Sequence, residues 1–170
     1  MAGKMSAGLL LYRKVRGHLE VFLAHPGGPF WKNKDLGVWS IPKGEFTAEE
    51  GAFNAALREF EEETGFRIAG DFQPLEPARQ SSGKVVHAWA VQGDCDASAV
   101  KSNTFSMEWP PKSGKQREFP EIDRADWFDI ASARKKIVKG QIPLIDQLER
   151  RVGGRDEQVR EGDGGLGSQG

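Results

Sequence analysis

Three glutamates on one face of a predicted helix constrain this chain more than any other feature. At about 100° per residue, Glu59, Glu62 and Glu63 fall together on one side of that helix. Like charges repel at close range, so a protein keeps such a cluster chiefly to hold a positive group. A divalent metal ion is the expected occupant, because hard cations such as Mg²⁺ take oxygen ligands. Glu61 points away from the other three, and we interpret it as an ordinary solvated side chain.

The limits of this helix are well marked in the sequence. Thr47 is a favourable N-cap residue, and Glu50 three positions later completes a capping box. Gly65 suits a left-handed C-terminal cap. Apolar residues recur at helical spacing between these limits, at Phe53, Leu57 and Phe60. The helix is therefore expected to have one packing side and one carboxylate side.

Apolar runs predict strands on both sides of this helix. Before it, residues 9–12 and 19–23 indicate an antiparallel hairpin, and residues 39–41 a short strand. Residues 25–38 between them form an expected surface loop. After the helix, the predicted strands are residues 84–91, 103–109 and 127–128. Asp129 is expected to cap a helix through residue 138, and Pro143 to open another.

The composition predicts one soluble domain. The chain has 170 residues, with 24 Lys or Arg, 25 Asp or Glu and a formal net charge of -1. This balance gives no electrostatic reason to bind long nucleic acid. Cys95 is the only cysteine, which excludes a disulfide framework within the chain, and the three histidines show no ligand spacing. The first apolar stretch, residues 9–12, is too short for a signal peptide or membrane span, so we expect a cytoplasmic protein without a membrane partner.

Glycine and charge dominate the C-terminal residues, so the expected domain covers residues 1–152 and residues 153–170 form a disordered tail. The sequence leaves open whether the protein is a monomer or a homodimer.

The predicted helix lies inside a longer pattern of fixed spacing. The segment reads Gly44, five residues, Glu50, seven residues, Arg58-Glu59-Phe60, one residue, Glu62-Glu63, one residue, Gly65-Phe66. It resembles the Nudix box of the Nudix hydrolases at every defined position. The resemblance implies an α+β fold, the Nudix α/β/α sandwich with a mixed β-sheet and a catalytic loop-helix-loop. It also implies a pyrophosphohydrolase that uses Mg²⁺, for which Mn²⁺ substitutes, and binds a small-molecule nucleotide.

The resemblance assigns roles to the residues of the box. It implies that Glu59, Glu62 and Glu63 bind the metal together with the backbone carbonyl of Lys43. In an alternative interpretation, one of these three glutamates is the general base and not a metal ligand, and Glu59 is the preferred candidate. In the family, a salt bridge matching Arg58 and Glu50 orients the loop and the catalytic helix. A purely structural role for this pair is equally consistent with the sequence, because Glu50 also completes the capping box.

Outside the box, many relatives supply one further acidic residue late in the domain. Three glutamates are candidates for it, and the last two are favoured: Glu108, Glu118 and Glu121. Ordinary loop charges are the alternative interpretation. The candidates for contact with substrate are Lys43, Trp31, Lys112 and again Glu121. Cations bind phosphates, and indole rings stack on bases. Surface charge and loop packing are the alternatives for these residues.

The residues before the box bear on the substrate. The Pro42-Lys43-Gly44 sequence is similar to diadenosine polyphosphate hydrolases, whereas relatives that act on nucleoside triphosphates often have Pro-Gly-Gly there. This favours dinucleoside polyphosphates. The alternative is a house-cleaning pyrophosphohydrolase of (deoxy)nucleoside triphosphates. The tyrosine that diadenosine polyphosphate hydrolases often place against adenine is not identifiable, since Tyr12 is the only tyrosine. A third possibility is a non-catalytic nucleotide-binding module, in which degenerate box glutamates are expected.

Overall fold

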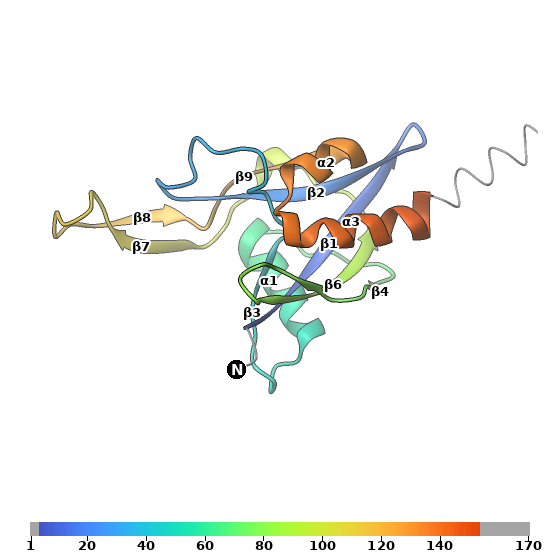
Figure 1. Cartoon of the computed structure of the whole chain (residues 1–170), viewed down its shortest axis with the longest axis horizontal. Helices are drawn as coiled ribbons and strands as arrows, with labels where there is room; N and C mark the ends of the chain where they lie inside the picture. Colours follow the sequence, from blue (N-terminus) through green and yellow to red (C-terminus); the bar gives the residue numbers. More distant parts are fainter. Residues whose placement is uncertain (1–3, 154–170) are drawn as a thin grey trace, which may run out of the picture.

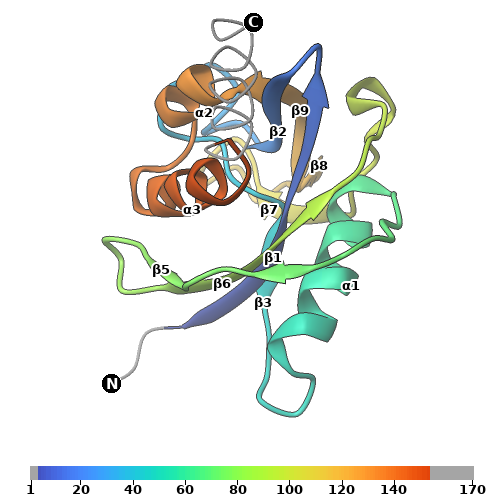
Figure 2. The same ribbon diagram turned by 90° about the vertical axis from the view of Figure 1, so that its right-hand side faces the viewer.

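A mixed seven-stranded sheet with helices on both faces forms the centre of the molecule (Figures 1 and 2). The structure is a computed structural model that describes residues 4–153. Five strands run in the order β4-β6-β1-β2-β9, with β3 added to β1 and β5 to β6. Their bounds are β1 Met5–Val15, β2 His18–Pro26, β3 Lys43–Glu45, β4 Gln73–Pro74, β5 Ala78–Arg79, β6 Val85–Gln92 and β9 Ile122–Asp129. β1 and β6 are parallel, and the other pairs are antiparallel.

Helices cover the two faces of this sheet, as Figure 2 shows. Helix α1, Ala52–Thr64, packs on one face, where Leu9 and Leu11 of β1 meet Phe60. Helices α2, Ile130–Lys136, and α3, Ile142–Leu148, cover the other face, where Leu10 meets Leu144. Short 3-10 turns at Ala97–Ala99 and Lys139–Gln141, and a π-helical turn at Glu149–Gly153, complete the elements. Because both faces are buried, residues 7–12 of β1 form a continuous run without a charged or strongly polar side chain. The predicted α/β/α sandwich with a mixed sheet is confirmed.

The start of α1 differs from the sequence prediction. The N-cap is Gly51, at φ 84, and no side chain caps the helix. Thr47 instead closes a turn before it, accepting hydrogen bonds from the backbone N–H groups of Glu50 and Gly51 at 3.1 and 3.2 Å. The predicted capping box is therefore wrong. The positive φ of Gly51 separates the turn from the helix, and the carboxylate of Glu50 binds Arg58. At the other end Gly65 adopts the predicted left-handed cap, at φ 83.

The predicted hairpin is formed by β1 and β2. The strand predicted at residues 84–91 is β6, which begins and ends one residue later. Residues 39–41 make only isolated bridges, Ser40 to Ala24 and Trp39 to Ile137, and the regular strand begins at β3. The predicted strand at residues 127–128 is part of the longer β9. Asp129 caps α2 by accepting from the Ser132 N–H, and Pro143 lies in the first turn of α3, both as predicted.

A second, two-stranded sheet lies outside the main one. It consists of β7, Thr104–Glu108, and β8, Gln116–Pro120, and Figure 1 shows it projecting from the body. The loop after β2 lies against it, since a Cβ on Gly28 would come within 3.0 Å of the Phe105 ring. We call residues 27–37 and 104–120 together the arm. The predicted strand at residues 103–109 is thus confirmed, but it pairs away from the main sheet.

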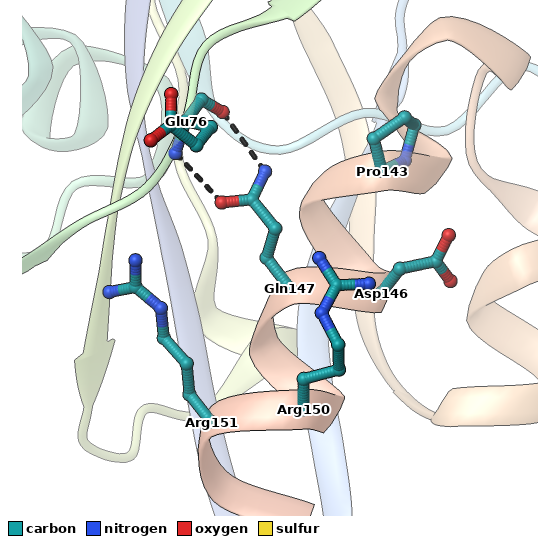
Figure 3. Close-up of a pocket in the computed structure, with 6 residues that line it drawn as sticks. All are labelled: Glu76, Pro143, Asp146, Gln147, Arg150 and Arg151. Carbon is teal, nitrogen blue, oxygen red and sulfur yellow. Dashed lines mark hydrogen bonds between the residues drawn. The ribbon is translucent and has the colours of Figure 1, made fainter.

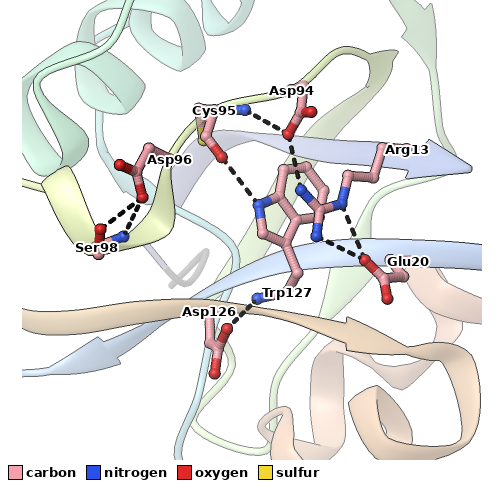
Figure 4. A network of polar contacts seen from close by, with 8 residues as sticks. All are labelled: Arg13, Glu20, Asp94, Cys95, Asp96, Ser98, Asp126 and Trp127. Atoms are coloured by element: carbon pink, nitrogen blue, oxygen red, sulfur yellow. Dashed lines mark hydrogen bonds and ion pairs between the residues drawn. The ribbon is translucent and has the colours of Figure 1, made fainter. Parts of the chain in front are cut away.

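Arg13, near the turn that joins β1 to β2, links several strands of the main sheet (Figure 4). The Arg13 guanidinium donates to Glu20 at 2.9 Å and to Asp94 at 2.8 Å. Its carbon lies 4.1 Å from the ring centre of Trp127, a cation–π contact, and Trp127 donates to the Cys95 carbonyl at 3.1 Å. These contacts join β1, β2, β9 and the segment after β6. They fix the position of β9, which begins directly after Glu121.

The predicted tail, apart from Gly153, lies outside the described residues. Within residues 4–153, no helix is long and apolar enough to cross a membrane.

Candidate active site

The glutamate face of α1 lies against β3. A Cβ on Gly44 would come within 2.0 Å of the Glu59 carboxyl carbon. Only glycine leaves room for this close approach, which explains the glycine that opens the box. The backbone N–H of Lys43 donates to Glu63 at 3.0 Å. The helix and β3 therefore bring two glutamates against the same short strand.

Burial sets the protonation of these carboxylates. Desolvation raises the pKa of Glu63 to about 8, against the opposing hydrogen bond from Lys43. Desolvation also raises the pKa of Glu59, and the hydrogen bond from Arg58 opposes that shift. Burial lowers the pKa of the Lys43 ammonium. Each shift shows a charged group in a poorly solvated place, which is typical of a functional site.

Arg58 connects the turn before the helix to the glutamate face. Its guanidinium forms a two-point ion pair with Glu50, with one N–O distance of 2.9 Å. It also donates to Glu59 at 2.8 Å and to Glu62 at 3.1 Å. The hydrogen bond to Glu50 is the largest cause that raises the pKa of Arg58, and it lowers the pKa of Glu50. The predicted Arg58–Glu50 salt bridge is present, and it takes the place of the capping box.

A fourth carboxylate, that of Glu121, approaches from the segment between β8 and β9. Burial and the charge of Glu62 raise its pKa, and its charge in turn raises the pKa of Glu59 and Glu63. The other two candidates for the further acidic residue lie on the arm. Glu118 accepts from the Thr104 hydroxyl at 2.8 Å, and Glu108 from the Lys112 backbone N–H at 2.8 Å. Of the three, Glu121 is the one that the fold brings to the box.

The donor set suits a hard divalent cation. Arg58 contacts Glu59 and Glu62, and the carboxylates of the site repel one another: the charge of Glu62 raises the pKa of Glu59 and Glu121, and the charge of Glu121 raises the pKa of Glu59 and Glu63. A cation relieves this repulsion. No three His, Cys, Asp or Glu side chains within residues 4–153 form a ready-made ligand cluster, because Glu59 and Glu62 face Arg58 while Glu63 faces Lys43. The ligand set of Glu59, Glu62, Glu63 and the Lys43 carbonyl stays a prediction.

A pocket of about 180 Å³ opens beside these carboxylates. Its polar side is formed by Lys43, Glu63 and Glu121. The remaining walls come from both ends of the loop after β2, the residues before β3 and the start of β9: Ala24, Pro26, Val38, Ser40, Ile41 and Ile122. This lining places one basic and two acidic groups beside mostly apolar walls, and it includes two of the predicted substrate residues, Lys43 and Glu121.

The other two predicted substrate residues lie on the arm rather than in the pocket wall. Trp31 is 41% exposed, and the Lys34 ammonium lies 5.3 Å from its ring centre. Lys112 is exposed in the turn between β7 and β8, with a positive φ of 62. The sequence predicted contact with substrate for both residues, and the structure separates them from the pocket lining.

Sequence reasoning gave no role to His25, which is completely buried behind this region. Its Nδ1 lies 2.8 Å from an Asp123 carboxylate oxygen. Its Nε2 donates to the Lys34 carbonyl at 2.6 Å. The ring thus joins the loop after β2 to β9. No local pattern signals this, because both partners come from elsewhere in the chain.

A larger cavity, of about 350 Å³, lies on the outer side of α3 (Figure 3). There the Gln147 side chain hydrogen-bonds the backbone N–H and carbonyl of Glu76, at 2.7 and 3.0 Å. Arg150 and Arg151 flank this pair, and Arg151 donates to the Pro74 carbonyl at 2.8 Å. These contacts join the segment between β4 and β5 to α3. The cavity contains none of the box glutamates.

The fold and the glutamate-bearing helix are those of Nudix hydrolases, which act on pyrophosphate bonds of nucleotide compounds and generally use a divalent metal. The family model of the NUDIX domain matches residues 4–148. The chain therefore belongs to the NUDIX domain family.

Two curated relatives share part of this sequence. An octanoyltransferase of Myxococcus xanthus is 31% identical over 101 residues, which are 59% of this chain and 25% of the relative. The mRNA-decapping enzyme subunit 2 of Saccharomyces cerevisiae (strain YJM789) is 28% identical over 117 residues, 66% of this chain and 10% of the relative. This chain thus spans a quarter or less of the length of the curated relatives it matches.

Solved structures resemble nearly the whole chain. A binary complex of a C. elegans Ap4A hydrolase matches with a TM-score of 0.61 and 22% identity, over 89% of this chain and 98% of that one. The NUDIX domain of Shewanella oneidensis NrtR, complexed with ADP ribose, matches with a TM-score of 0.62 and 18% identity, over 89% and 90%. At these identities the likeness shows the fold.

Proposed function

We propose that this protein hydrolyses a phosphoanhydride bond in a compound that contains a nucleoside diphosphate. The observation that carries the proposal is the gathering of four carboxylates, from Glu59, Glu62, Glu63 and Glu121, around one short strand and one arginine. An anionic substrate does not bind such a cluster unless a cation is present. The residues therefore fit a metal-dependent reaction on a polyphosphate.

Mg²⁺ is the proposed metal, with Mn²⁺ as a substitute, held by Glu59, Glu62, Glu63 and the Lys43 carbonyl. When bound, it neutralises phosphate charge and lowers the pKa of a coordinated water. In the alternative form of the proposal, Glu59 is the general base instead of a metal ligand. Burial raises its pKa above the ordinary value, and a base works best when its pKa lies closer to the working pH.

Arg58 and Glu50 have a positioning role in this proposal. Arg58 holds the carboxylates of Glu59 and Glu62 on one side and Glu50 on the other, so the turn before α1 and the glutamate face keep one geometry. Lys43 and Glu121 border the pocket and are proposed to contact the substrate there.

Dinucleoside polyphosphates of the diadenosine tetraphosphate type are the favoured substrates. The Pro42-Lys43-Gly44 sequence supports this choice, and the fold likeness to an Ap4A hydrolase is consistent with it. The phosphates of such a substrate suit the local chemistry, because Lys43 lines the pocket that lies beside the carboxylates.

A nucleotide panel with product identification tests the proposal. We expect ATP and AMP from diadenosine tetraphosphate, in the presence of Mg²⁺. Release of pyrophosphate and a nucleoside monophosphate from triphosphates alone would contradict the substrate class and favour a (deoxy)nucleoside triphosphate pyrophosphohydrolase. Running the reaction in ¹⁸O-water identifies the phosphorus that is attacked. If no member of the panel is hydrolysed with Mg²⁺ or Mn²⁺, the protein is a non-catalytic binding module and the proposal fails.

A further inference from the structure

The pocket beside the glutamates is too small for a whole nucleotide. Its volume is about 180 Å³, whereas pockets that enclose drug-sized ligands hold roughly 300–1,000 Å³. It therefore accommodates phosphate groups, and the nucleoside has to lie outside it. Pro26 and Val38, which border the loop of the arm, line the pocket, and so does Ile122 at the root of the hairpin. A ligand whose phosphates occupy the pocket consequently has the root of the arm beside it.

The arm displays two large aromatic side chains in water. Phe30 is 58% exposed and Trp31 is 41% exposed. The Phe30 ring lies edge-on to Trp109 of the hairpin side, with ring centres 5.5 Å apart. Lys34 stands 5.3 Å from the centre of the Trp31 ring. Exposed rings next to a cation are the arrangement on which bases of nucleotides stack, because every base has a flat π-face.

The loop that carries these rings is fixed at both ends. At its root the Gly27 N–H donates to the Glu121 carbonyl at 2.8 Å, and a Cβ on Gly27 would come within 1.9 Å of the Pro120 carbonyl oxygen. Beyond the rings, buried His25 holds the Lys34 carbonyl at 2.6 Å. The exposed rings are therefore held in one place before any ligand binds, which lowers the entropic cost of recognition. The root contact also joins the loop to the residue that supplies the fourth carboxylate.

The charge of the arm complements a polyphosphate. Five cations lie on it, at Lys32, Lys34, Lys112, Lys115 and Arg117, against three acids. Each acid has a partner. Asp35 accepts from Trp39 and pairs with Lys136. Glu108 and Glu118 accept from a backbone N–H and a hydroxyl of the hairpin itself. Although the whole chain has a formal charge of -1, this surface attracts anions.

We propose that the arm is the base-recognition surface of the protein. It binds a nucleotide whose phosphates lie between Lys43, Glu63 and Glu121 and whose base stacks on the rings of Phe30 and Trp31. The identity of the ligand as a nucleotide rests on the proposed function. The location of its base rests on the pocket volume, the exposed rings and the anchored loop.

Binding of AMP and ribose 5-phosphate, each with Mg²⁺, tests this inference by calorimetry. Neither ligand has a phosphoanhydride bond, so binding is measured without turnover, and the two differ in the base. We expect the wild type to prefer AMP by about tenfold to a hundredfold. The double variant Phe30→Ala/Trp31→Ala should lose most of this preference. Leu36→Ala is the matched control, since Leu36 is 67% exposed on the same loop and carries no ring; it should retain the preference.

Equal affinity of the wild type for the two ligands would overturn the inference, and so would a double variant that keeps its preference for AMP. If the double variant fails a thermal-melt check, Trp31→Leu replaces it, because leucine keeps an apolar side chain but removes the stacking ring. A wild type that prefers AMP yet hydrolyses nothing in the nucleotide panel would refute the proposed function and leave the base-recognition surface standing.

Discussion

Helix α1 buries charged side chains, whereas the arm exposes large apolar ones. On α1, Glu59 and Glu63 are carboxylates held where burial raises their pKa. On the arm, Phe30 and Trp31 are large rings held in water. Neither arrangement stabilises the fold, because burying a charge costs free energy and a ring left in water contributes no burial energy. In the proposals made above, the two regions contact different parts of one ligand: α1 its phosphates and the arm its base.

The largest expected effect is on the helix side of this comparison. Glu62→Gln removes a ligand charge at nearly constant shape, so with Mg²⁺ it should lower kcat by about 10²–10⁴-fold while the fold survives. The variant still offers an oxygen to Arg58, which lies 3.1 Å from Glu62. Steady-state kinetics on the preferred substrate checks this. Glu61→Gln is the control, because Glu61 pairs with Arg67 instead. Near-normal turnover of Glu62→Gln would contradict the assignment of Glu62 as a metal ligand.

A smaller effect is expected when the positioning of the helix is disturbed. Glu50→Gln removes the charge from the ion pair with Arg58, which holds Glu59 and Glu62. We expect kcat to fall by about 10–100-fold through misplaced carboxylates. Glu49→Gln, one residue earlier, should behave as wild type. An unchanged kcat in Glu50→Gln would show that the pair has only a structural role.

The arm side predicts a change in KM rather than in kcat. In Gly27→Ala the added Cβ meets the Pro120 carbonyl oxygen, so the loop is pushed away from the root of the hairpin. We expect KM for a nucleotide to rise about three- to tenfold, which corresponds to part of one stacking contact. Gly37→Ala provides a comparison on the same loop, since nothing lies within 4 Å of its added Cβ, although its positive φ of 74 adds backbone strain. Equal KM values for Gly27→Ala and wild type would show that the position of the arm does not affect substrate binding.

The smallest expected effect is the pH dependence of stability. The Glu63 pKa is about 8 in the folded protein and 4.5 as the ordinary value. Between these values the folded protein binds this proton more tightly than the unfolded chain. In EDTA the melting temperature should therefore be highest with Glu63 protonated and fall as the pH rises from about 4.5 to 8. Glu63→Gln should flatten this decline, whereas Phe30→Ala on the arm should not. A decline of equal slope in Glu63→Gln would disprove the role of Glu63.

The sequence predicted the helix side far better than the arm. The box residues follow one another at fixed spacing, so helical geometry alone places Glu59, Glu62 and Glu63 on one face. The prediction failed at the start of the helix, where a charge-assisted ion pair between Arg58 and Glu50 competes with a weaker cap.

The arm depends on contacts between distant segments, which a single sequence does not reveal. Alternation within residues 103–109 indicates a strand but not its partner, so the separate β7–β8 sheet could not be foreseen. Glu121 was one of three candidates until the fold brought it to the box. The role of His25 depends on Asp123 and the Lys34 carbonyl, and no spacing connects the three.

The parallel pairing of β1 with β6 has a consequence for how the chain folds. β1 begins at Met5, but its parallel partner β6 begins only at Val85. The outer partner of β2 is β9, which begins only at Ile122. At a synthesis rate of about 5–20 residues per second, the β1–β2 hairpin emerges several seconds before either of these partners. During that time both of its edges are unpaired and able to join another chain. The buried central strand of the main sheet is thus also a segment that is exposed to aggregation on the ribosome.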